Sequence, residues 1–86
     1  MTPEDQAAIT AAFGDVAAEL SRAMKYPLYN SAHEGYAVIL EELDELWEHV
    51  KTRQSLRDVG AMRAEAAQVA ATAILFMLMI DAGERR

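Results

Sequence analysis

Carboxylates crowd one short segment, EELDELWEHV, which contains Glu41, Glu42, Asp44, Glu45 and Glu48. In a helix, residues three apart share a flank, so Glu42 and Glu45 would project together. Glu65 lies in a later, mostly apolar segment, AEAAQVAATAILFMLMI, where an ionised carboxylate is costly unless it is paired or bound to a cation. Carboxylate oxygens favour Mg²⁺ or Mn²⁺ over zinc, and protein-bound Mg²⁺ commonly contacts substrate phosphates. Convergence of these glutamates would therefore indicate a divalent-cation site that acts on phosphate esters or anhydrides.

Other interpretations of these residues stay open. A row of carboxylates along a helix is often only its solvated face. His33 and His49 are alternative ligands, although His33 lies in the first turn of its predicted helix, where capping and surface roles are common. His49 lies one turn beyond Glu45 and suits a hydrogen bond to a ligand. Trp47 and Tyr36 are expected in the core. Three other residues are candidates for the lip of a substrate pocket: Tyr26, Tyr29 and Asn30.

The spacing of apolar residues predicts three helices, over residues 3–25, 31–52 and 59–81. The first presents one apolar stripe, typical of a core helix: Ile9, Phe13, Val16, Leu20 and Met24. Ser31 and Glu34 form a capping-box pattern that begins the second helix. Asp58 is a suitable N-cap for the third helix, and Gly83 is a suitable stop.

The third predicted helix is apolar on both sides, which has a consequence for assembly. Such a helix must be covered all round, and three helices from one short chain do not easily do this. We therefore expect a single all-α domain over residues 1–86, a three-helix chain that forms an oligomeric helical bundle. The sequence does not distinguish a dimer from a tetramer.

The composition limits which partners the protein can bind and indicates where in the cell it is located. The net charge of −6 argues against nucleic acid, because phosphate backbones are bound by basic surfaces. There is no cysteine, which excludes disulfides and thiolate metal sites. The acidic start MTPEDQ is unlike a signal peptide, and the apolar run over residues 69–80 is short for a membrane span. We expect a soluble cytoplasmic protein.

The acidic segments resemble those of a known family. The MazG-like all-α nucleoside triphosphate pyrophosphohydrolases carry Glu-Glu-x-x-Glu on one helix and Glu-x-x-Asp on the next. EELDE, with Glu41, Glu42 and Glu45, is similar to the first half, and EAAQ, with Glu65 and Gln68, to the second. The resemblance covers roughly residues 30–80. Gln68 departs from the pattern, because the family has an aspartate there.

The resemblance implies Mg²⁺-dependent hydrolysis of a nucleoside triphosphate to a monophosphate and pyrophosphate by an oligomeric all-α bundle. It implies that Glu42, Glu45 and Glu65 bind the metal, with Gln68 as a weaker neutral ligand. Glu41 would be a further ligand or would orient the attacking water. Candidate phosphate contacts are Lys51, Arg53 and Arg57. The alternative is a non-catalytic oligomerisation or interaction protein that keeps the fold.

Overall fold

The structure is a computed structural model that describes residues 1–83, so residues 84–86 of the predicted domain lie outside the described part. It contains three α-helices and one short 3₁₀ helix: α1 (Pro3–Ala23), α2 (Ala32–Val50), η1 (Gln54–Leu56) and α3 (Val59–Asp81). No strand occurs within residues 1–83. The predicted all-α class and the three predicted helices are confirmed, with bounds that differ by at most two residues.

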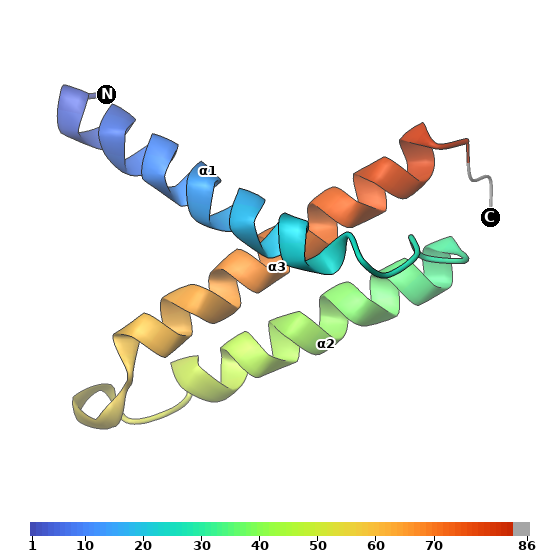
Figure 1. Cartoon of the computed structure of the whole chain (residues 1–86). Coiled ribbons are helices and arrows are strands. Elements are labelled where there is room, and N and C mark those ends of the chain that lie inside the picture. The colour runs from blue at the N-terminus through green and yellow to red at the C-terminus, as the bar shows by residue number, and fades with distance from the viewer. Residues whose placement is uncertain (84–86) are drawn as a thin grey trace.

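The third helix is the centre of the arrangement, because both other helices pack on it. α2 runs alongside α3, connected to it through η1, whereas α1 crosses α3 near the middle (Figure 1). The N-terminal half of α1 extends away from the other helices, and residues 1–15 are all exposed. α3 is thus covered on two sides along only part of its length.

Local interactions explain where the helices begin and end. The Ser31 hydroxyl accepts a hydrogen bond from the Glu34 amide at 3.1 Å, and the Asp58 carboxylate accepts one from the Ala61 amide at 3.0 Å. Both N-caps are as predicted. The Glu34 carboxylate accepts from the backbone and side chain of Asn30, so the expected capping box is displaced by one residue. Gly83 ends α3 with a φ of +90°, which glycine adopts without strain.

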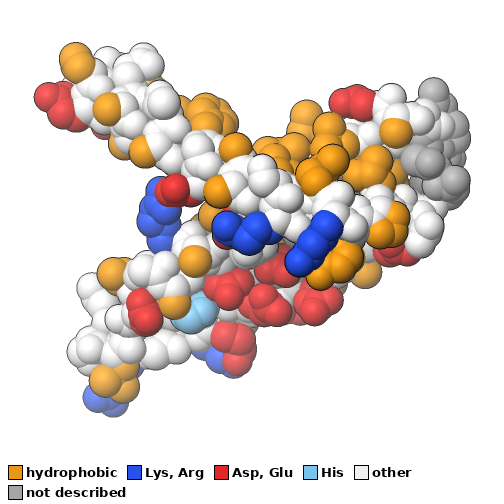
Figure 2. Space-filling view, in the orientation of Figure 1, with side chains coloured by type: hydrophobic (Ala, Val, Ile, Leu, Met, Phe, Trp, Pro, Cys, Tyr) orange, Lys and Arg blue, Asp and Glu red, His pale blue; other side chains and the backbone are white. Residues whose placement is uncertain are grey.

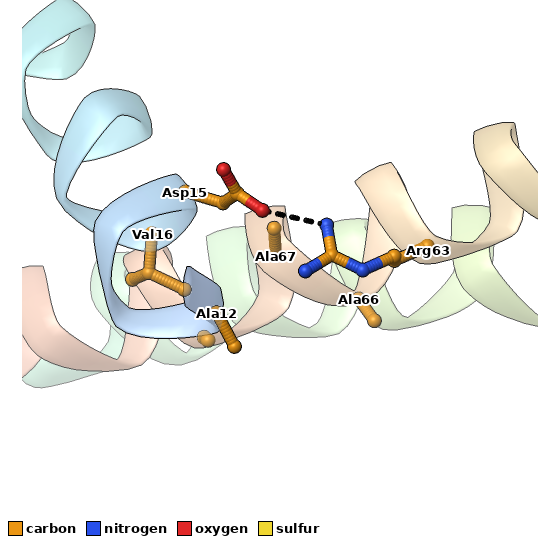
Figure 3. Close-up of a pocket in the computed structure, with 7 residues that line it drawn as sticks. Ala12, Asp15, Val16, Arg63, Ala66 and Ala67 are labelled. Carbon is orange, nitrogen blue, oxygen red and sulfur yellow. Dashed lines mark ion pairs between the residues drawn. The ribbon is translucent and has the colours of Figure 1, made fainter. Parts of the chain in front are cut away.

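Small side chains let α1 cross closely over α3. A hollow of about 240 Å³ at the crossing is lined mostly by alanines, and Arg63 of α3 pairs with Asp15 of α1 at 2.8 Å across it (Figure 3). The predicted apolar stripe of α1 is buried only in part, since Val16 and Leu20 are half-buried whereas Phe13 is 69% exposed. The prediction of an ordinary core helix is therefore wrong for the N-terminal half of α1.

The orientation of α2 differs from the predicted one. Trp47 and Tyr36 were expected in the core, yet Trp47 is 56% and Tyr36 is 64% exposed. The side of α2 that packs on α3 instead includes the buried Gly35 and the half-buried Leu46 and Glu42. The prediction that Trp47 and Tyr36 are core residues is wrong within this chain, because α2 is rotated so that a carboxylate faces its neighbour.

Gly35 permits the close approach of α2 to α3. A methyl group built on its Cα would lie 2.6 Å from a ring carbon of Phe76 and 2.8 Å from a ring carbon of Tyr29. These separations are shorter than any van der Waals contact between carbons. An alanine here would push α2 and α3 apart or displace both rings.

The chain is more open than a compact domain of its length. Its radius of gyration is 14.7 Å, against about 12 Å expected for 86 residues. Only two hydrophobic side chains, those of Ala71 and Met79, are buried within the described range. By length and composition α3 could also cross a membrane, a property shared by core helices of soluble proteins. The cytoplasmic location stays a prediction.

Candidate metal centre

Three glutamates from two helices meet beside the α2–α3 contact. Glu42 and Glu45 come from adjacent turns of α2, and Glu65 comes from α3. Each contributes one carboxylate oxygen, and these three oxygens lie within 4.8 Å of one another. We call this group the glutamate cluster. Figure 2 shows acidic side chains gathered in this region, between the helices and next to Lys and Arg side chains.

The glutamate cluster lacks the partners that buried carboxylates usually have. One oxygen of Glu42 and one of Glu65 are buried without a hydrogen bond. Among the described residues, three basic side chains pair with other acids: Arg22 with Glu19, Lys51 with Glu48, and Arg63 with Asp15. An unpaired buried carboxylate is costly. A divalent cation would supply the missing charge and occupy the unpartnered oxygens.

The raised pKa values in the glutamate cluster are consistent with a site for a cation. Burial, and then the negative charge of Glu45, raise the pKa of Glu42 from 4.5 to about 7. The same two causes raise the pKa of Glu65, while nearby His49 partly opposes them. Burial and the neighbouring negative charge therefore disfavour the ionised form of both carboxyl groups when no cation is present. A bound cation would reverse that preference, because it interacts favourably with the ionised form.

Two residues flank the glutamate cluster. His49 is half-buried and close enough for its charge to affect Glu65. Glu41 is exposed, and its charge contributes to the raised pKa of Glu42. These positions suit a hydrogen-bonding role for His49 and a water-orienting role for Glu41, and both roles stay predictions. His33 lies nine residues before Glu42, about 14 Å along the helix axis, and lines a different hollow beside Tyr36 and Phe76.

Gln68 makes a contact that its sequence context does not indicate. It lies one turn beyond Glu65 on α3, and its side-chain amide donates a hydrogen bond to Glu19 of α1. Glu19 in turn accepts from Arg22. An aspartate at position 68 would place a carboxylate against Glu19, so the local surroundings favour the neutral amide. The role of Gln68 as a metal ligand stays a prediction.

The three residues predicted to contact phosphate differ in how far they already interact with other groups of the chain. Arg57 donates to the backbone carbonyls of Val50 at 2.6 Å and Thr52 at 3.1 Å, and so caps the C-terminal end of α2. Lys51 pairs with Glu48 at 2.6 Å, while Arg53 is exposed before η1. Arg22 and Lys25, near the C-terminal end of α1, were not predicted from the sequence as phosphate contacts. Only the crossing of α1 over α3 brings them beside Gln68.

Of the aromatic residues considered for a pocket lip, Tyr29 is the most constrained. Its hydroxyl donates to the backbone carbonyl of Thr72 at 3.3 Å. Tyr26 is 65% exposed, with the Lys25 ammonium 5.3 Å from its ring centre. Asn30 is engaged with Glu34 at the start of α2. Tyr26 and Tyr29 line one hollow together.

No family model matches this chain. Comparisons with curated proteins and with solved structures also found no match. The likeness of its acidic segments to the MazG-like family therefore stays a prediction that depends on the motifs and on the geometry of the glutamate cluster.

Proposed function

We propose that this chain is a Mg²⁺-dependent nucleoside triphosphate pyrophosphohydrolase that works as a homo-oligomer. One observation carries the proposal: carboxylate oxygens of Glu42, Glu45 and Glu65 lie within 4.8 Å of one another, and two of these residues have a buried oxygen with no hydrogen-bond partner. On a fully solvated acidic face, both oxygens of each carboxylate would be in contact with water. The oxygen-only donor set fits Mg²⁺ or Mn²⁺.

The reaction adds water across one phosphoanhydride bond. The oxygen of water bonds to the α-phosphorus, the bond to the bridging oxygen breaks, and pyrophosphate leaves with the electron pair. Mg²⁺, when bound, would withdraw charge from the phosphate oxygens. Glu42, Glu45 and Glu65 would hold the ion, and exposed Glu41 would orient the water and accept its proton. Manganese suits the same oxygens.

The direct test is a search for pyrophosphate. The protein is incubated with a mixture of nucleoside and deoxynucleoside triphosphates, with and without Mg²⁺. Pyrophosphate is expected only with Mg²⁺, and Glu65→Gln should reduce its formation at least a hundredfold. The control variant Glu48→Gln also removes one negative charge, but at a residue of α2 that pairs with Lys51. It should leave turnover unchanged. If no triphosphate is hydrolysed and Mg²⁺ does not raise the melting temperature, the non-catalytic interaction protein is the better description.

The Gln68 position allows a sharper comparison. Gln68→Asp restores the carboxylate of the family motif but opposes Glu19, whose carboxylate now accepts from the Gln68 amide. In the double variant, Gln68→Asp with Glu19→Gln, the amide at position 19 can donate to the carboxylate at position 68. The hydrogen bond between the two positions is therefore kept, with its direction reversed. We expect higher turnover in the double variant than in Gln68→Asp alone. Equal turnover in both would count against a metal-binding role for position 68.

Self-association has support of its own. The chain exposes 6234 Å², whereas a compact 9.5 kDa protein exposes about 5,000 Å². The excess, about 1,200 Å², is comparable to the roughly 800 Å² that each partner buries in a standard interface. An apolar stripe on α2 faces away from α3, formed by Tyr36, Leu40, Leu43, Trp47 and Val50. A second copy of the chain would cover this stripe, in place of the α3 surface expected from sequence.

A further inference from the structure

Two adjoining hollows lie where α1 leads into α2, and Ala23 and Tyr26 line both. The first, about 200 Å³, is almost wholly apolar, with Leu28, Val38 and Leu75 in its wall. We call it the apolar hollow. The second, about 340 Å³, is lined by polar and charged groups, including Arg22, Lys25 and Gln68. We call it the charged hollow.

The apolar hollow lies along the same α2–α3 contact as the glutamate cluster. Val38 precedes Glu42 by four residues on α2, about 6 Å along the axis, and Thr72 follows Glu65 by seven residues on α3, about 10 Å. Tyr29, in the wall of the hollow, donates to the Thr72 carbonyl. Its pKa is raised by burial and then by the charge of Glu42, which also indicates that the hollow and the cluster are close.

The charged hollow is related to the glutamate cluster through α3, which contributes Gln68 to the hollow and Glu65 to the cluster. Gln68 lies one turn from Glu65 and connects to Glu19, which neutralises Arg22. Lys25 then contributes the net positive charge of the hollow. Figure 2 shows Lys and Arg side chains next to the acidic group in this region. Cations beside a metal-binding cluster suit a ligand with several negative charges.

We propose that the apolar hollow binds the base of a nucleotide, and that the charged hollow guides its phosphates toward the glutamate cluster. A volume of about 200 Å³ is below the roughly 300 Å³ of pockets that enclose whole drug-sized ligands, so the hollow suits a single ring system. Tyr26 and Tyr29 offer aromatic surface, on which any base can stack. This inference rests on the proposed function, because it assigns a binding site to one part of the proposed nucleotide substrate, its base.

The test uses uncharged nucleosides, which need neither metal nor turnover. Adenosine, guanosine, cytidine and uridine are titrated separately into ¹⁵N-labelled protein without Mg²⁺. At least one should shift the amide signals of Tyr29, Val38 and Leu75. Tyr26→Ala should weaken that binding about tenfold, the loss of one stacking contact. Phe13→Ala is the matched control, since Phe13 is 69% exposed against 65% for Tyr26 and lines neither hollow.

The outcomes separate this inference from the proposed function. Nucleoside binding that is weakened in Tyr26→Ala and kept in Phe13→Ala supports the base site, whether or not Mg²⁺ stabilises the protein. No shift with any nucleoside, or equal weakening in both variants, overturns it even if Mg²⁺ binds. Lys25→Ala should weaken nucleoside triphosphate binding several-fold and spare nucleosides. Equal weakening of both ligands would overturn the assignment of the charged hollow to phosphates.

Discussion

Replacement of Glu42 by glutamine should stabilise the metal-free protein at neutral pH and remove its response to Mg²⁺. The pKa of Glu42 is about 7 in the folded protein, against 4.5 as its ordinary value. The folded state thus holds this proton more tightly than the unfolded chain does. The free energy of unfolding therefore falls as the pH rises from about 4.5 to 7, and the loss is complete above that range.

The size of the effect follows from the same pKa difference. At 1.36 kcal/mol per pH unit it corresponds to about 3 kcal/mol. Because Glu42 is only partly buried, solvent screening reduces this figure, and we expect about 1 kcal/mol. Mg²⁺ at 100 times its dissociation constant would add about 2.7 kcal/mol to the wild type, since the ion binds the ionised carboxylates.

The assay is chemical denaturation between pH 4.5 and 8, with EDTA or with Mg²⁺. Wild-type protein in EDTA should lose stability across this range, and Glu42→Gln should lose less. Mg²⁺ should restore the wild type at pH 8 and have little effect on the variant. Glu48→Gln, which removes an exposed charge from the same helix, should respond to Mg²⁺ as the wild type does. Undiminished Mg²⁺ stabilisation in Glu42→Gln would refute the assignment of this cluster as the metal site.

Three further predictions concern the fold and its assembly. Gly35→Ala should lower the free energy of unfolding by about 1–3 kcal/mol through overpacking. Gly14→Ala, with no atom within 4 Å of the added carbon, should raise it by about 0.5–1 kcal/mol. Equal effects of the two variants in chemical denaturation would contradict the close packing at Gly35. Arg57→Ala should cost about 1 kcal/mol, because the α2 carbonyls lose their donor, without changing KM for a triphosphate; a raised KM would instead restore Arg57 as a phosphate contact. Leu43→Lys should convert the oligomer to monomer in analytical ultracentrifugation, and a wild type that is already monomeric would contradict the α2 interface.

The helices and their ends were predictable because their signals are local. Ser31 and Asp58 accept from amides three residues later, and Gly83 adopts a positive φ. Each signal acts within one turn, so neighbouring residues suffice to read it. The motif spacing also identified Glu42, Glu45 and Glu65 as candidates, and the structure brings these three residues together.

The orientation of α2 was not predictable in the same way. A helical wheel shows that Tyr36, Leu43 and Trp47 share a side, but an arc covered by another chain has the same pattern as one covered by α3. The contact between Glu19 and Gln68 was equally hidden, because it joins residues on helices that only the chain's path brings together. Distant pairings of this kind leave no periodic signal in either segment.

By itself, the sequence determines three helices, their caps and a set of acidic residues at helical spacing, since these depend on interactions between close neighbours in the chain. Only the tertiary structure decides that α2 turns its carboxylates toward α3 and leaves its aromatic side exposed, and that α1 brings Glu19 to Gln68. Those outcomes depend on which surfaces pack together, and packing is a property of helix pairs that no single helix encodes.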